Sequence, residues 1–124
     1  MRGLLQNGGG ILARTTWNKY HAKKVVKDGH TFDSKKEAGR YTELKILEKA
    51  GIISRIKCQV PFELIPAQYE NGKCIERSCK YFADFTYWQD GQYIVEDAKG
   101  VKTDAYRIKK KAMLYKYGVK IREV

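Results

Sequence analysis

The sequence predicts an α/β fold, on three observations. Residues 34–50 and 103–117 carry the capping residues and apolar spacing of helices. Residues 56–64 alternate between apolar and polar side chains, which is typical of a half-buried strand. Residues 81–97 hold two runs rich in aromatic and β-branched side chains around Asp90-Gly91, the strongest short-range signal for a hairpin with a two-residue turn.

Weaker signals predict the rest of the chain. Residues 1–19 show no sustained periodicity and contain three consecutive glycines, so we expect a flexible basic N-terminal arm followed by a single domain over residues 20–124. A second Asp-Gly pair within residues 24–32 predicts a short hairpin. Residues 66–78 read as a polar loop, and residues 119–124 as a last short strand.

The first helix has clear ends. Ser34 followed by Glu37 forms a capping box, and Gly51 ends the segment. Its predicted buried stripe consists of Ala38, Tyr41, Leu44 and Leu47.

The second helix is capped by Thr103, carries Asp104 in its first turn and ends before Gly118. Its predicted buried stripe consists of Ala105, Ile108, Ala112 and Tyr115. This stripe would leave Lys110 and Lys111 pointing outward.

The charge distribution favours a nucleic-acid partner. The formal net charge is +11, and residues 1–27 carry six basic and no acidic side chains. Residues 99–124 carry nine basic and two acidic side chains, whereas residues 28–98 are nearly balanced. Lysine and arginine contacts to phosphates release counterions and give affinity that does not depend on base sequence. A basic surface that only solubilises the protein is the alternative.

Other compositional features limit the class of protein. No apolar run is long enough to cross a membrane, and the first residues lack the apolar core of a signal peptide, so we expect a cytoplasmic protein without a membrane partner. Cys58, Cys74 and Cys79 are an odd number without zinc-site spacing, so we expect reduced thiols.

The predicted hairpin brings charged side chains together. If Gln89 pairs with Gln92 across the turn, Asp84 lies opposite Asp97, and Lys99 shares the face of Asp97. Two carboxylates and one ammonium group at this spacing either hold a divalent cation or form a solvated strand end. A bulge in either strand would undo the pairing.

A third acid lies on the first helix. Glu37 falls near the middle of the apolar stripe, whereas Glu43 lies to one side of it. Glu37 either serves only as the cap or completes an acidic site with Asp84 and Asp97. Glu96 points to the opposite face of the hairpin and is expected to be dispensable, although it is the fallback ligand if the strand is shifted.

These residues, in this order, resemble the PD-(D/E)XK nuclease superfamily, and most of all a family of small phage-encoded proteins regarded as endonuclease- or Holliday-junction-resolvase-like. The resemblance extends from about Lys19 to the C-terminus. Its blocks are Phe32 to Ala38, Gln59, Tyr81 with Ala83-Asp84-Phe85, Glu96 to Gly100, and Lys109 to Lys111. Two positions depart from the superfamily name: Ala83 replaces its proline, and Asp97 is the shorter of its two acids.

The resemblance implies a restriction-endonuclease-like core, in which a mixed central β-sheet is flanked by two main helices. It implies a Mg²⁺-dependent DNA endonuclease, active also with Mn²⁺, that leaves a 5′-phosphate and acts on double-stranded or branched DNA as a homodimer. Asp84, Asp97, the Ala98 carbonyl and Glu37 would bind the metal, and Lys99 would act on the attacking water. The basic residues expected to bind nucleic acid are Lys23, Lys24, Lys102, Arg107, Lys109, Lys110 and Lys111.

Two other functions remain open at this point. A non-catalytic DNA-binding phage protein with a vestigial nuclease site would need the same basic ends. RNA as the substrate ranks below both, because no aromatic RNA-binding signature is visible.

Overall fold

The computed structural model describes residues 24–98 and 102–124, which belong to two compact units, Met1–Lys35 and Lys36–Val124. The predicted arm, Lys23 and Lys99 lie outside the described residues. No helix in the described ranges is long and apolar enough to cross a membrane.

The first unit contains the predicted short hairpin. Strand β1 (Val25–Lys27) pairs antiparallel with β2 (His30–Phe32), and Lys27 lies opposite His30. Asp28 and Gly29 both have positive φ angles, 51° and 78°, as a type I′ turn requires. The prediction for this segment is confirmed.

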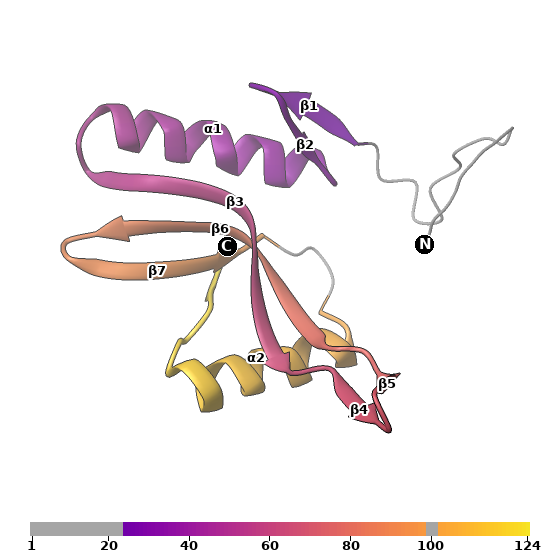
Figure 1. Cartoon of the computed structure of the whole chain (residues 1–124). Helices are drawn as coiled ribbons and strands as arrows, with labels where there is room; N and C mark the ends of the chain where they lie inside the picture. Colours follow the sequence, from indigo (N-terminus) through magenta and orange to yellow (C-terminus); the bar gives the residue numbers. More distant parts are fainter. Residues whose placement is uncertain (1–23, 99–101) are drawn as a thin grey trace, which may run out of the picture. The chain divides into compact units, whose positions relative to one another are not determined.

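The larger unit is built around a four-stranded mixed sheet in the order β3-β6-β7-β8 (Figure 1). Strand β6 runs antiparallel to both β3 and β7, whereas β8 runs parallel to β7. The elements from the first helix onward are α1 (Lys35–Lys49), β3 (Ile53–Ile65), β4 (Gln68–Glu70), β5 (Lys73–Glu76), β6 (Cys79–Gln89), β7 (Gln92–Asp97), α2 (Asp104–Tyr117) and β8 (Arg122–Glu123). The α/β class, the mixed central sheet and the two main helices agree with the sequence-based expectation.

The two helices lie on opposite sides of the sheet, as Figure 1 shows. On the α1 side, the ring of Tyr41 stacks on Phe85 with centroids 6.4 Å apart. On the α2 side, the ring of Tyr106 lies 6.4 Å from that of Tyr81. The core on this second side consists of Leu64, Tyr81, Ala83, Val95, Tyr106, Met113 and Ile121.

Strand β6 changes the face that it presents to each helix at Asp84. Ala83 belongs to the core under α2, yet Phe85, two residues later, stacks on Tyr41 of α1. In a regular strand these two side chains would share a face. The partner strand is irregular at the same level, because Gln59, between the pairs formed by Cys58 and Val60, has a φ of 52°. Figure 1 shows that β3 bends along its length.

Two predictions for the polar segments need correction. Residues 66–78 are not a loop, because β4 and β5 pair across a turn in which Asn71 and Gly72 have φ angles of 51° and 79°. The last strand is shorter than predicted and covers only Arg122–Glu123.

The ends of α2 are as predicted, but its buried face is not. Thr103 Oγ1 accepts a hydrogen bond from the Tyr106 N–H at 3.1 Å, and Gly118 adopts the left-handed conformation at the C-terminal end. The residues that are buried are Tyr106 and Met113, whereas Ile108 and Tyr115 are 67% and 94% exposed. Both stripes have helical spacing and lie about one residue apart around the helix axis. Contacts of α2 with Tyr81 and with β8 determine which of the two stripes is buried, and the sequence of the helix alone does not contain this information.

Candidate functional site

The β6–β7 hairpin has the register that the two-residue turn predicts. Gln89 lies opposite Gln92, and the pairing continues without a bulge to Phe85 and Glu96. Asp84 and Asp97 are the next residues on their strands, and both are buried. The two acids therefore lie at the end of an unshifted ladder, where β6 bends.

Asp84 is linked to the helix acid by a single amide group. Its Oδ1 accepts a hydrogen bond from Gln59 Nε2 at 3.4 Å, and the same nitrogen donates to Glu37 Oε2 at 2.9 Å. Asp84 Oδ2 accepts from the Ala98 N–H at 2.8 Å, which ties it to the end of β7. Glu37, 4% exposed, therefore faces Asp84 from the first turn of α1, as its place in the apolar stripe predicts.

Asp97 is hydrogen-bonded to a different residue from those that contact Asp84. Its Oδ2 accepts a hydrogen bond from the Tyr81 hydroxyl at 2.5 Å. The pKa of Tyr81 lies well above its usual range, first because the ring is buried, then because of this bond and the charge of Asp97, and to a smaller extent the charge of Asp84. The pKa of Tyr106 is also raised, by burial and its bond to Glu123 and then by Asp97 and Asp84. Of the two acids, Asp97 is the one with a hydrogen bond to Tyr81.

The Cys58 thiol is affected by the charges of Glu37 and Asp84. Burial raises its pKa to about 11, and the charges of Glu37 and Asp84 contribute in the same direction. Hydrogen bonds through the Gln59 amide and the Ala98 N–H thus connect Glu37, then Asp84, then the end of β7 at Asp97, and we call these three acids the row.

The donor atoms in this row are those that a hard cation prefers, but they do not form a complete metal site. Carboxylate oxygens are the ligands of Mg²⁺ in proteins, and the amide nitrogen of Gln59 lies between two of them as a cation would. Within residues 24–98 and 102–124, however, no three His, Cys, Asp or Glu side chains are arranged to hold a metal ion. Glu37 and Asp84 fit as two ligands.

Glu96 lies, as expected, on the opposite face from Asp97, and it forms hydrogen bonds with Arg40 and Tyr87. Its two carboxylate oxygens accept from Arg40 Nε at 2.7 Å and from Arg40 Nη2 at 2.9 Å. Tyr87 also donates to it, at 2.5 Å. Glu43, the third acid considered, is exposed and pairs with Arg40 at 3.0 Å. Of these three acids, Glu37 is the one bonded to the Gln59 amide that Asp84 shares.

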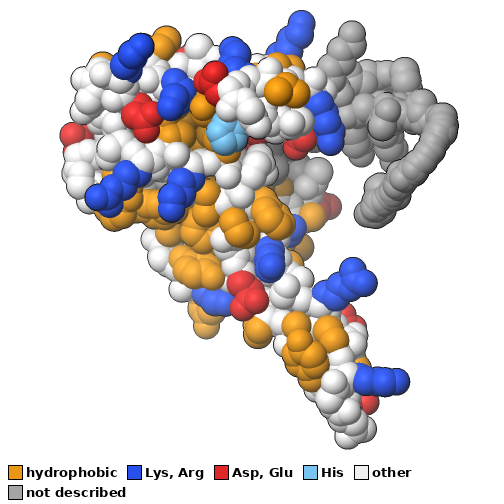
Figure 2. Space-filling view, turned by 45° about the horizontal axis from the view of Figure 1, so that its top comes forward, with side chains coloured by type: hydrophobic (Ala, Val, Ile, Leu, Met, Phe, Trp, Pro, Cys, Tyr) orange, Lys and Arg blue, Asp and Glu red, His pale blue; other side chains and the backbone are white. Residues whose placement is uncertain are grey.

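The basic residues proposed to bind nucleic acid differ in their surroundings. Lys102 and Lys110 form ion pairs with Glu123, and Arg107 pairs with Asp104. Lys110, which was expected to point outward, is partly buried, because the buried face of α2 lies closer to it than predicted. The remaining described members are Lys24 and Lys111, which are exposed, and Lys109, which is partly buried. On the face in Figure 2, Lys and Arg side chains are dispersed.

Sequence reasoning did not assign a role in the site to Gln59 or Tyr81. Both belong to the blocks that carry the family resemblance, but neither can be joined to an acid by spacing along the chain. Gln59 reaches Asp84 only through the pairing of β3 with β6, strands separated by two further strands in the sequence. The alternation of apolar and polar residues in β3 also does not predict the positive φ angle of Gln59.

Comparisons with curated proteins and with solved structures gave no match. Residues 17–123, most of the chain, match a family model described as "Protein of unknown function (DUF1064)", and the chain therefore belongs to this family.

Proposed function

We propose that this chain is a Mg²⁺-dependent DNA endonuclease of the PD-(D/E)XK type, with a restriction-endonuclease-like core. The observation that carries the proposal is that two buried acids, Glu37 of α1 and Asp84 of β6, share the Gln59 amide, while Asp84 also accepts a hydrogen bond from the Ala98 N–H, next to Asp97 at the end of β7. Buried carboxylates near one another repel and cost stability unless positive charge offsets them. A site that binds a cation gives this arrangement a use.

Each residue of the row has a part in the proposed reaction. Asp84, Asp97 and Glu37, with the Ala98 carbonyl, would hold Mg²⁺, which would supply charge stabilisation at the phosphoryl oxygens and a more acidic water. The Ala98 N–H keeps one oxygen of Asp84 in place, so that the other oxygen faces Gln59. Gln59 would release the carboxylates that its amide now joins. Lys99 Nζ would orient the attacking water or accept its proton.

The proposed substrate is double-stranded or branched DNA, including four-way junctions, and the product carries a 5′-phosphate. Exposed cations such as Lys24 and Lys111 would contact the phosphate backbone. A homodimer would place two such sites on the two strands of a junction. The protein would then act in the cytoplasm of a phage-infected cell, in recombination, replication or packaging of DNA.

One observation favours a second function. Within the described residues the acids lack a third ligand at metal-binding spacing, and Gln59 already joins two of them. A non-catalytic DNA-binding phage protein with a vestigial nuclease site would have this arrangement.

Cleavage assays separate the two functions. Purified protein is incubated with linear, supercoiled, flapped and four-way DNA, in Mg²⁺, in Mn²⁺ or in EDTA. We expect cleavage in either metal, products that can be ligated because they carry a 5′-phosphate, and none in EDTA. Asp84→Asn and Lys99→Ala should abolish cleavage while DNA binding, measured by gel shift, survives.

Two variants on α1 provide a matched pair. Glu37→Gln should lower the cleavage rate strongly, whereas Glu43→Gln, which loses only an exposed ion pair on the same helix, should cleave like the unmodified protein. Cleavage at an unchanged rate by Asp84→Asn would refute the mechanism. DNA binding without cleavage of any of the four substrates would favour the non-catalytic function.

A further inference from the structure

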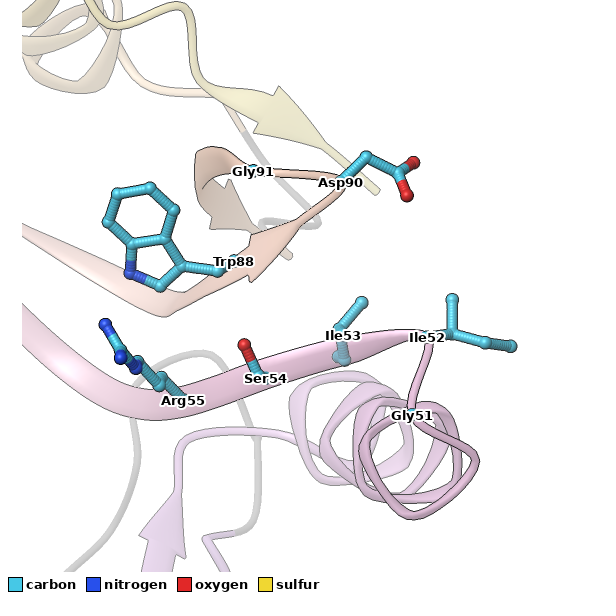
Figure 3. Close-up of a pocket in the computed structure, with 8 residues that line it drawn as sticks. All are labelled: Gly51, Ile52, Ile53, Ser54, Arg55, Trp88, Asp90 and Gly91. Atoms are coloured by element: carbon cyan, nitrogen blue, oxygen red, sulfur yellow. The ribbon is translucent and has the colours of Figure 1, made fainter.

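A cavity of about 380 Å³ lies between the start of β3 and the β6–β7 turn (Figure 3). Residues 51–55 line one side, and Trp88, Asp90 and Gly91 line the other. Its volume is near the lower end of the range for sites that take small molecules, so it fits one planar group with a short attachment.

Trp88 gives this cavity an aromatic wall. Its side chain is 38% exposed, although tryptophan is usually largely buried. The Tyr93 ring, directly opposite on β7, lies 5.3 Å away at 51° and supports the indole without covering it. An indole fixed in this way offers a flat surface for another ring to stack on.

Arg55 supplies a cation from an irregular backbone. It has a φ of 58°, within the bulge of β3 between Ser54 and Lys57. Bulges turn a side chain from its regular direction, and a bulky residue rarely adopts this conformation. In Figure 3 the Arg55 guanidinium and the Trp88 indole extend towards the same end of the cavity, and the Asp90 carboxylate points away from both. The backbone irregularity thus brings a positive charge beside an exposed ring.

We propose that this cavity binds one unpaired nucleobase of a DNA strand. The base would stack on Trp88, its phosphate would pair with Arg55, and the Ser54 hydroxyl, which points into the cavity in Figure 3, would contact the base edge. The inference rests on the proposed nucleic-acid partner, but not on catalysis. It assigns a preference for DNA that has single-stranded positions, such as flaps, because bases of an intact duplex are stacked on one another.

A protein partner explains the cavity less well. The exposed ring adjoins a guanidinium and a hydroxyl rather than a continuous apolar surface, and the chain as a whole carries a charge of +11. Stacking on a ring beside a cation is the usual way in which proteins hold single-stranded nucleic acid.

The test measures binding in EDTA, so that cleavage cannot contribute. The chain has two tryptophans, and Trp17→Phe leaves Trp88 as the only one. We expect oligothymidylate to quench the Trp88 fluorescence and a blunt duplex of equal length to quench it much less. With a labelled oligonucleotide, Trp88→Ala should weaken binding by about 5- to 150-fold, the range for loss of one base–aromatic stack.

Arg55→Gln and Lys57→Gln form a matched pair, since each removes one exposed cation from the same strand. Arg55→Gln should weaken binding of the single strand several-fold more than Lys57→Gln, while both reduce duplex binding equally. Circular dichroism shows whether each variant is folded, and Trp88→Phe, which keeps a ring, should bind better than Trp88→Ala.

Three results would overturn the inference: unchanged Trp88 fluorescence at saturating oligonucleotide, equal effects of the two strand variants, or a fluorescence change that follows protein concentration without DNA. The last result would show that a second copy covers the cavity. If quenching occurs but no DNA is cleaved in Mg²⁺, the proposed nuclease function is refuted and the base-binding site is supported. If DNA is cleaved without quenching, the nuclease function is supported and the base-binding site is refuted.

Discussion

The Arg40–Glu96 ion pair can be used to measure how strongly the hairpin depends on α1. Glu96 is fully buried and accepts two hydrogen bonds from Arg40, whose side chain is 22% exposed. Removal of one partner of a buried pair costs about 3–5 kcal/mol, because the other charge is left without compensation. Water can reach the partly exposed position of Arg40, so we expect Arg40→Met to lower the free energy of unfolding by about 3 kcal/mol.

The double variant should recover most of this loss. In Arg40→Met with Glu96→Gln no charge is buried, and the glutamine can still accept from the Tyr87 hydroxyl, so its cost should be about 1 kcal/mol. The second substitution would then recover about 2 kcal/mol of the stability that Arg40→Met loses. Glu43→Gln, which removes the exposed partner of Arg40, should change stability by less than about 0.5 kcal/mol.

Urea unfolding followed by circular dichroism measures these values. With a slope of about 1–2 kcal/mol per molar urea, a loss of 3 kcal/mol lowers the midpoint by roughly 1.5–3 M. Equal destabilisation by the single and double variants would refute the reasoning, because the cost would then not come from a stranded charge. Glu96→Gln should also cleave DNA if the protein is a nuclease, because Glu96 lies on the opposite face from Asp97.

Three further predictions follow from the pKa values and the helix cap. The hydrogen bond from Tyr106 and the ion pairs with two lysines lower the pKa of Glu123 from about 4.5 to about 2. Glu123→Gln should therefore destabilise the protein by its full amount above pH 4.5, and the difference from the unmodified protein should disappear as the pH falls towards 2. Urea unfolding at each pH measures this difference. In a variant whose other two cysteines are replaced by serine, Cys58 should react slowly with iodoacetamide at pH 8, because its pKa is about 11. Mg²⁺ bound at Glu37 and Asp84 would offset the charges of these two acids and so speed the reaction. An unchanged reaction rate in Mg²⁺ would argue against a cation at this site. Thr103→Ala should destabilise the protein by about 1 kcal/mol and Thr103→Ser by much less, in the same assay; equal losses would show that the cap hydrogen bond is not the cause.

The parts of the fold that local chemistry determines could be predicted from the sequence. The Asp90-Gly91 turn determined the register of β6 and β7, α1 begins directly after Ser34, and the Thr103 cap determined where α2 begins. Both signals act within a few residues, so no tertiary contact is needed to interpret them.

The parts that depend on distant contacts could not be predicted. Strands β4 and β5 consist of exposed residues, so burial leaves no alternation in their sequence. The buried face of α2 depends on Tyr81 and Glu123, which lie outside the helix. Gln59 meets Asp84 only because β3 pairs with β6.

The irregular backbone of β3 has another consequence, for self-association. Among the strands that the structure describes, β3 has a neighbour on one side only, so its other edge offers backbone groups along 13 residues. Long regular edges invite another chain to add as a strand and so promote aggregation. The left-handed residues Arg55 and Gln59 and the missing N–H of Pro61 divide this edge into short pieces. The residues that shape the proposed sites therefore also protect the sheet from edge-to-edge pairing.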